Sequence, residues 1–252
     1  MRTTGPRFET VQRRRVRSGL AEVERDRTRA DAWLVSVDGL PQSYVDLTDP
    51  TDLPCCAMRR VADVIDALPP APLSALHIGG AACSLPRYIQ HTRPGSDQLV
   101  VDVDGELVDL VTTHLPIPAG IDLQVENGLD TIRNVRGCDL VVVDVFEGNV
   151  MPAEFASTEF HADVAAALAG DRTYIVNVFD RPGLRATAAL VSAVTEWFGE
   201  PLVIAEVGVL RGEGIGNVVI VSTDAELPVE ELDRRARAAR FPARVSAGWP
   251  HR

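Results

Sequence analysis

The fold is decided by residues 75–104, which read ALHIGGAACSLPRYIQHTRPGSDQLVVDVD. A short apolar run at 75–78 ends in the pair Gly79-Gly80, and a second apolar run follows at 98–103. Between the two runs, the apolar residues of 85–90 have helical spacing. A buried strand, a turn of small residues, a helix and a second buried strand are the repeating unit of a parallel sheet. The stretch therefore predicts an α/β fold.

The same alternation continues toward higher residue numbers. Further apolar runs are found at 121–125, 139–145, 173–178, 202–209 and 216–221. Helical patterns are found at 58–68, 106–114, 152–169, 184–198 and 228–239. Continuous apolar strands separated by helices predict a Rossmann-like parallel sheet that is covered by helices on both faces.

A different pattern precedes this alternation. Trp33, Val35 and Val37 lie at alternate positions ahead of the turn Asp38-Gly39, and extended character resumes at 44–47. Two short strands across an Asp-Gly turn predict a small N-terminal β-hairpin domain. The apolar face of this hairpin must be covered either by its own domain or by a second copy of the chain.

Charge is distributed unevenly along the chain. Residues 1–30 hold nine arginines and four acidic residues, whereas the rest of the chain is strongly acidic. An acidic body repels phosphate backbones and favours cationic small molecules as ligands, although acidity can also serve solubility alone, so we expect no nucleic acid partner. The arginine-rich start is typical of a disordered arm. Its arginines are densest at Arg13, Arg14, Arg15 and Arg17. The predicted division is a basic, flexible tail over 1–30, a hairpin region over 31–56 and a main domain over 57–252.

The composition excludes several classes of enzyme. All 25 basic residues among the 252 are arginine, so Schiff-base chemistry, pyridoxal phosphate anchoring and the GxxxxGK[ST] phosphate loop are excluded. The hydrolase motif GxSxG and the metalloprotease motif HExxH are absent as well. No segment is long and apolar enough for export or membrane insertion. The chain has four cysteines, Cys55, Cys56, Cys83 and Cys138. They form no CxxC pair and no regular disulfide framework, which favours a cytoplasmic protein without a metal site.

Polar and small residues follow the ends of four predicted strands. Because the carboxyl ends of parallel strands meet at one edge of the sheet, these residues are expected to converge there. Asp102 lies 23 residues beyond Gly79, a spacing at which an acid accepts hydrogen bonds from ribose hydroxyls. Asp104 is instead expected to cap the next helix. The convergent set predicts a nucleoside-binding site and consists of Gly79, Gly80, Asp102, Glu126, Asn127, Asp144 and Glu147.

Two histidines are weaker candidates for a site. His77 lies inside a predicted buried strand, which favours a hydrogen-bonded core histidine over a catalyst. His161 follows Glu159-Phe160 on a predicted helix, and we expect it to face solvent or a neighbouring subunit.

The order and spacing of several motifs over residues 32–245 resemble the spermidine synthase family of aminopropyltransferases. The matching segments are VDGLPQS at 37–43, LHIGG at 76–80, VDVDGELV at 101–108, DLVVVD at 139–144 and STEF at 157–160. Arg211-Gly212 and Gly216-Asn217 near the last predicted strands are similar to the family as well. The resemblance implies the seven-stranded fold of methyltransferases that use S-adenosylmethionine, and a homodimer.

The family's reaction transfers an aminopropyl group from decarboxylated S-adenosylmethionine to an amine such as putrescine, without a metal. Carried over to this chain, the resemblance implies that Asp144 is the general base and that Glu147 grips the diamine. It further implies that Asp102 accepts from the ribose, that Asn127 contacts the adenine and that Gln42 faces the substrate from the hairpin.

The chain departs from the family at two places on the amine side. Ala82 stands where the family has an aspartate that binds the amine of the donor. The segment Cys55-Cys56-Ala57-Met58 stands where the family has Tyr-(His or Gln)-Glu-Met. Three functions therefore stay open: an aminopropyltransferase with altered amine specificity, a methyltransferase that uses S-adenosylmethionine itself, and a non-catalytic nucleoside-binding protein. The loss of the acid at Ala82 fits the second, because that donor carries a carboxylate.

Overall fold

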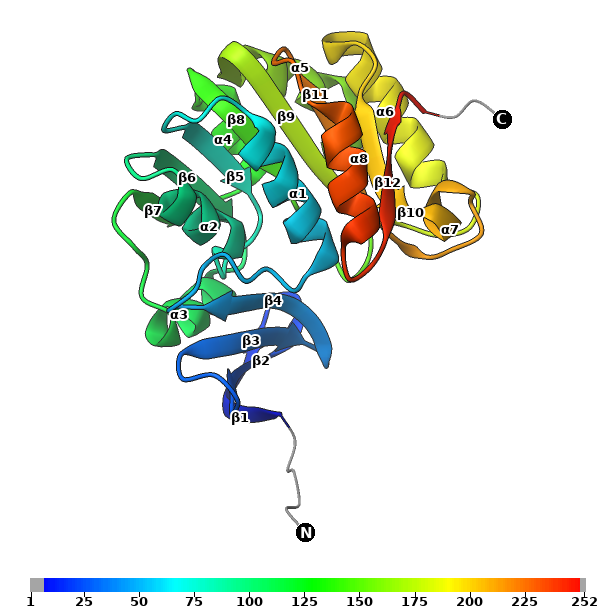
Figure 1. Ribbon diagram of the computed structural model, residues 1–252. Coiled ribbons are helices and arrows are strands. Elements are labelled where there is room, and N and C mark those ends of the chain that lie inside the picture. Colours follow the sequence, from blue (N-terminus) through cyan, green and yellow to red (C-terminus); the bar gives the residue numbers. More distant parts are fainter. Residues whose placement is uncertain (1–6, 250–252) are drawn as a thin grey trace.

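A computed structural model describes residues 7–249 and contains one large sheet and one small sheet (Figure 1). The strands of the large sheet are β5 (Ser74–Ile78), β6 (Asp97–Asp102), β7 (Ile121–Val125), β8 (Cys138–Val143), β9 (Leu168–Asp180), β10 (Leu202–Glu206), β11 (Gly216–Thr223) and β12 (Ala243–Ala247). Their order across the sheet is β12-β10-β11-β9-β8-β5-β6-β7.

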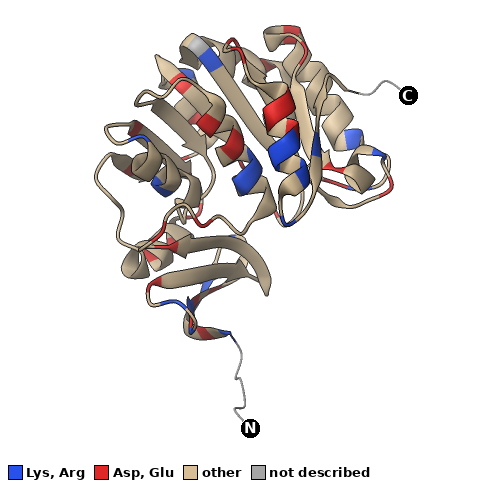
Figure 2. Ribbon diagram, in the orientation of Figure 1, with Lys and Arg blue, Asp and Glu red and all other residues tan. Residues whose placement is uncertain are grey.

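Helices cover both faces of the large sheet, as the sequence predicted. One face packs against α1 (Cys56–Ala67), α2 (Ser84–Thr92) and α8 (Val229–Ala238), and the other against α4 (Gly128–Asn134), α5 (Thr158–Ala167) and α6 (Arg185–Phe198). Short helical segments occur at η1 (Ala153–Ala156) and α7 (Val207–Leu210). Charged residues gather on the helices and on the small sheet, whereas the central strands are mostly uncharged (Figure 2). The mixed α/β fold with a mostly parallel central sheet is thus confirmed.

The large sheet departs from the expected parallel arrangement near one edge. The strands β5 to β9 pair in parallel, but β11 is antiparallel to both β9 and β10. The connection between β10 and β11 is too short for the crossover that a parallel pair requires. β12 adds an eighth, antiparallel strand beside β10, at residues for which the sequence predicted no strand.

The small sheet is antiparallel and contains β1 (Phe8–Val16), β2 (Gly19–Asp26), β3 (Ala32–Val37) and β4 (Leu40–Asp46) in that order. The predicted hairpin across Asp38-Gly39 is β3 and β4. The prediction of a flexible tail over 1–30 is wrong for Phe8–Asp26, which form β1 and β2, while residues 1–6 lie outside the described residues. The arginine run concealed the strands because charged residues occupy both faces of β1: Arg13 and Arg15 are exposed on one face and Arg14 is half-buried on the other.

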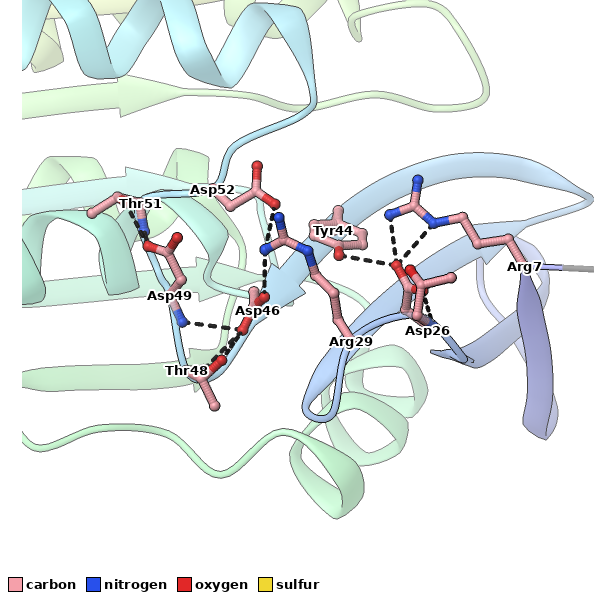
Figure 3. Close-up of polar contacts among 10 residues, drawn as sticks. Arg7, Asp26, Arg29, Tyr44, Asp46, Thr48, Asp49, Thr51 and Asp52 are labelled. Atoms are coloured by element: carbon pink, nitrogen blue, oxygen red, sulfur yellow. Dashed lines mark hydrogen bonds and ion pairs between the residues drawn. The ribbon is translucent and has the colours of Figure 1, made fainter.

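Ion pairs and hydrogen bonds hold these strands together (Figure 3). The Asp26 carboxylate is buried and accepts from Nε and Nη2 of Arg7 at 2.9 and 2.6 Å, and from the Tyr44 hydroxyl at 3.1 Å. Burial alone would raise the pKa of Asp26, but these bonds and those from Thr28 hold the pKa well below its usual range. Arg29 pairs in the same way with Asp46 at 2.9 Å, where β4 leads toward α1.

The apolar face of the hairpin is covered by its own chain. Val35 and Val37 pack in one cluster with Leu110, Val111 and other residues of α3 (Gly105–His114). The Trp33 ring lies 5.6 Å from the imidazole of His114, the last residue of α3. A homodimer, which the resemblance implies, would therefore need a different surface.

Both histidines considered from the sequence, His77 and His161, are buried. His77 is buried and its Nε2 lies 3.1 Å from Oε1 of Gln98, and burial lowers the pKa of the ring to about 4. The expectation that His161 faces solvent or a subunit is wrong, because this residue is 0% exposed. Its Nδ1 lies 2.7 Å from the carbonyl oxygen of Ser157, and its ring packs against Phe160 and Tyr174 on the inner side of α5.

Within residues 7–249, every helix is too short or too polar to cross a lipid bilayer. The same residues contain no group of three or more His, Cys, Asp or Glu side chains placed to hold a metal ion.

Candidate functional site

Backbone hydrogen bonds bring the ends of four parallel strands to one edge of the sheet. The Asp144 amide donates to the carbonyl of Ile78 at 2.9 Å, and the Gly79 amide donates to the carbonyl of Val101 at 2.8 Å. On the outer side, the Glu126 amide donates to the carbonyl of Asp102 at 3.1 Å. The residues that follow β5, β6, β7 and β8 are therefore neighbours at one edge.

Two glycines allow this close approach. Gly79 has a φ of +88°, and a Cβ at this position would lie 2.2 Å from the backbone oxygen of Asp144. A Cβ at Gly128 would lie 2.2 Å from Cγ2 of Ile78, so the first residue of α4 packs directly on the end of β5. Larger side chains at either position would force the strand ends apart.

The turn of small residues after β5 folds onto Asp102. Oδ2 of Asp102 accepts from the Ala81 amide at 3.2 Å, and Oδ1 accepts from the Asp104 amide at 2.9 Å. A carboxylate has about four acceptor positions, so each oxygen can still accept a further hydrogen bond. Burial raises the pKa of Asp102, and the backbone hydrogen bonds oppose this effect. The side chain is thus held rigidly with acceptor capacity to spare.

Asp144, directly after β8, is half-buried beside this turn. Its Oδ1 accepts from Nδ2 of Asn177 at 2.8 Å, while Oδ2 receives no hydrogen bond from any residue between 7 and 249. Burial raises the pKa of Asp144, and the nearby charge of Asp102 raises it further. Local desolvation, and to a smaller extent the charge of Asp144, raise the pKa of the Cys55 thiol, although Cys55 as a residue is exposed.

The residues after β7 are exposed and partly committed to capping a helix. Oδ1 of Asn127 accepts from the Leu129 amide at 3.0 Å and caps α4, which leaves the Asn127 NH2 group as a donor. Oε2 of Glu126 accepts from the Thr131 hydroxyl at 2.8 Å. Both residues lie at the same edge as Asp102, as predicted.

The structure does not join the remaining two predicted residues to this cluster. Glu147 is exposed on the loop after β8, where its Oε1 lies 3.9 Å from Nη2 of Arg17 in the turn between β1 and β2. Gln42 is exposed on β4, and within the described part of the chain its side chain bonds only to the carbonyl of Leu40, at 3.4 Å.

Two positions at which the resemblance implies a carboxylate, Ala57 and Ala82, are apolar and buried. Ala82 is only 5% exposed and packs in the apolar cluster of the small sheet. Asp104 does not replace the missing acid, because its carboxylate caps α3 at the Leu107 amide and accepts from both the amide and the hydroxyl of Ser18, each at 3.1 Å. The predicted capping role of Asp104 is confirmed.

Sequence reasoning missed three residues near the site: Arg17, Ser18 and Asn177. The first two were assigned to a tail. Asn177 is the one strongly polar residue near the centre of the apolar run 173–178, and that interruption of a buried strand was the available signal.

Comparison with solved structures shows what this chain is similar to. A probable spermidine synthase from Corynebacterium glutamicum ATCC 13032 matches with a TM-score of 0.85 and 26% sequence identity, over 97% of this chain and 92% of that chain. The chain is therefore similar to a spermidine synthase along almost its whole length. No protein-family model and no curated protein matches its sequence.

Two more distant structures share the fold of this chain. A spermidine synthase in complex with the transition state analogue AdoDATO matches with a TM-score of 0.64 and 13% identity, over 95% of this chain and 87% of that chain. Human methyltransferase-like protein 13 in complex with SAH matches with a TM-score of 0.60 and 18% identity, over 73% of this chain and 90% of that chain.

A separate hollow of about 710 Å³ lies toward the β10 and β12 side of the sheet rather than after β5 to β8. It is bordered by Gly183 and Leu184 before α6, by Leu210 of α7 and by Trp249 after β12. None of the site residues predicted from the sequence lines it.

Proposed function

We propose that the chain binds decarboxylated S-adenosylmethionine, or a related adenosine thioether, and transfers an aminopropyl group to a polyamine-like amine. The observation that carries this proposal is the meeting of Gly79, Asp102 and Asp144 at one edge of the sheet. The structure with AdoDATO and the structure with SAH share this fold, and both ligand names denote adenosyl compounds. Their likeness supports a donor of that class for this chain.

The turn after β5 and the Asp102 carboxylate would bind the adenosyl part. Gly79 and Gly80 carry no side chain, so a ligand can approach their backbone closely. The free acceptor positions of Asp102 suit the two ribose hydroxyls. The free NH2 group of Asn127 can donate to a ring nitrogen of adenine, and Glu126 lies at the rim beside it.

Asp144 would act as the base. Its free Oδ2 would take a proton from the ammonium group of the acceptor, so that the nitrogen lone pair becomes available. The nitrogen then attacks the methylene carbon beside the sulfonium, and the C–N bond forms as the C–S bond breaks. The bond electrons neutralise the sulfur, and methylthioadenosine leaves. The remaining task of the protein is to hold the two reactants in line.

A methyltransferase that uses S-adenosylmethionine is the second candidate, and it rests on Ala82. An aminopropyl donor ends in an ammonium, and burying that cation without a carboxylate costs several kcal/mol. S-adenosylmethionine carries a carboxylate at the same end, so an alanine at this position penalises it less.

Isothermal titration calorimetry with three compounds tests the proposal. We expect methylthioadenosine and one of the two sulfonium donors to bind. Tighter binding of decarboxylated S-adenosylmethionine supports aminopropyl transfer, and tighter binding of S-adenosylmethionine supports the methyltransferase. Absence of heat with all three compounds would refute both and leave a non-catalytic protein.

The proposal includes a cytoplasmic location and a homodimer. All four cysteines are free thiols, which suits a reducing compartment. Light scattering of the purified chain would show directly whether it is a dimer.

A further inference from the structure

A row of amide side chains leads from the antiparallel part of the large sheet to Asp144. Nδ2 of Asn177 on β9 donates to Oδ1 of Asp144 at 2.8 Å. Nδ2 of Asn217 on β11 donates in turn to Oδ1 of Asn177 at 3.1 Å. Asn177 is only 3% exposed, and Asn217 is half-buried. Three strands therefore contribute one connected set of hydrogen bonds.

The strand register places these side chains together. Val143 is the last residue of β8 and pairs in parallel with Val176, so the next residues, Asp144 and Asn177, lie side by side. Asn177 is opposite Val219 on β11, and Asn217 lies two residues before Val219. Residues two apart on a strand point to the same face of the sheet, so Asn217 reaches Asn177 diagonally.

The chemistry of the groups fixes the direction of every bond in the row. An ionised carboxylate only accepts hydrogen bonds, so Asn177 must turn its NH2 group toward Asp144. Its carbonyl oxygen then faces Asn217, which must donate. Asn217 thus opposes rotation of the Asn177 amide, which would bring a carbonyl oxygen against the carboxylate.

We propose that Asn177 and Asn217 are positioning residues for Asp144: Asn177 holds Oδ1 and leaves Oδ2 as the oxygen that takes the proton, and Asn217 locks the Asn177 amide in the donating orientation. This inference rests on the proposed role of Asp144 as the base. Apart from burial, two titratable groups interact electrostatically with this carboxylate: Asp102 at the end of β6 and the Cys55 thiol ahead of α1. Burial and the charge of Asp102 raise the pKa of Asp144, and the Asn177 bond opposes them.

The test is carboxyl-carbon NMR titration of Asp144 in the full chain without ligand, with assignment by Asp144→Asn. Asn177→Leu should raise the pKa of Asp144 by about one unit or more, because a hydrogen bond to a charged group is lost. Asn217→Leu should raise it by less. Thr173→Val is the matched control, since it removes the Thr173–Thr223 hydroxyl pair between the same two strands and should leave that pKa unchanged.

An unchanged pKa of Asp144 in Asn177→Leu would overturn the inference, and an unchanged pKa in Asn217→Leu would overturn the locking role. Should Asn177→Leu fail to fold, Asn177→Ala removes the same amide without adding volume. If the proposed function holds, the acidic limb of the plot of kcat against pH should move to higher pH in the Asn177 variants, by as much as the pKa of Asp144 rises. The Kd of methylthioadenosine should stay within about twofold of that of the unchanged chain. Because the titration uses no ligand, a shifted pKa without any donor binding would refute the proposed function alone.

Discussion

The donor side of the candidate site carries polar groups that are already held in place, whereas the amine side carries neutral groups and one acid paired with an arginine. By the donor side we mean Gly79, Gly80, Asp102, Glu126 and Asn127, and by the amine side Cys55, Ala57, Ala82 and Glu147. Asp144 lies between the two sides. The contrast separates two questions, because recognition of an adenosyl group and recognition of an amine depend on different residues.

The two sides also differ in what surrounds them. On the donor side, the Asp102 carboxylate is fixed by backbone amides of the large domain. On the amine side, the small sheet contributes directly, since Ala82 packs in its apolar cluster and Arg17 reaches Glu147. The one carboxylate of this side, Glu147, is thus already paired with an arginine.

The largest expected effect belongs to the residue between the two sides. Asp144→Asn should lower kcat by about two to four orders of magnitude, because the proton acceptor is lost. The Kd of methylthioadenosine should change little, as the product has no ammonium group to deprotonate. Steady-state kinetics and calorimetry on the same preparation check this, with the exposed α5 variant Glu159→Gln as the control. Unchanged kcat in Asp144→Asn would refute the assignment of the base.

A smaller effect is expected on the donor side. Asp102→Asn should weaken methylthioadenosine binding by about 10- to 150-fold, since hydrogen bonds to a charged group contribute about 1.5–3 kcal/mol. Asp122→Asn, an exposed change on the neighbouring β7, is the matched control. Equal binding by the two variants would show that Asp102 does not contact the ligand.

The smallest effect is expected on the amine side. Arg17→Ala should lower the KM of a diamine by about 1.4-fold to fivefold, because an exposed ion pair with Glu147 is worth about 0.2–1 kcal/mol. Arg15→Ala on the same small sheet controls for the loss of a surface charge. A KM that rises in Arg17→Ala would indicate instead that the arginine itself contacts the acceptor.

The sequence predicted the central fold well because that fold depends on local periodicity. Apolar runs and glycine turns located β5 to β9 within a few residues, and the strand-end rule brought Asp102 and Asp144 together. Prediction from the sequence failed at β1 and β2, because a run of arginines hid the alternation of buried and exposed residues, which only the packed structure reveals. The orientation of β11 depends on the length of one connection, and the commitment of Asp104 to Ser18 depends on a contact between distant residues. Neither can be read from a local pattern.

The most direct test of the donor side is a crystal structure of the chain with methylthioadenosine. The account predicts that both ribose hydroxyls lie within hydrogen-bond distance of the Asp102 carboxylate, with the adenine beside Asn127 and the sulfur turned toward Asp144. A ligand bound in the hollow near Leu184 and Trp249, or a ribose turned away from Asp102, would contradict it.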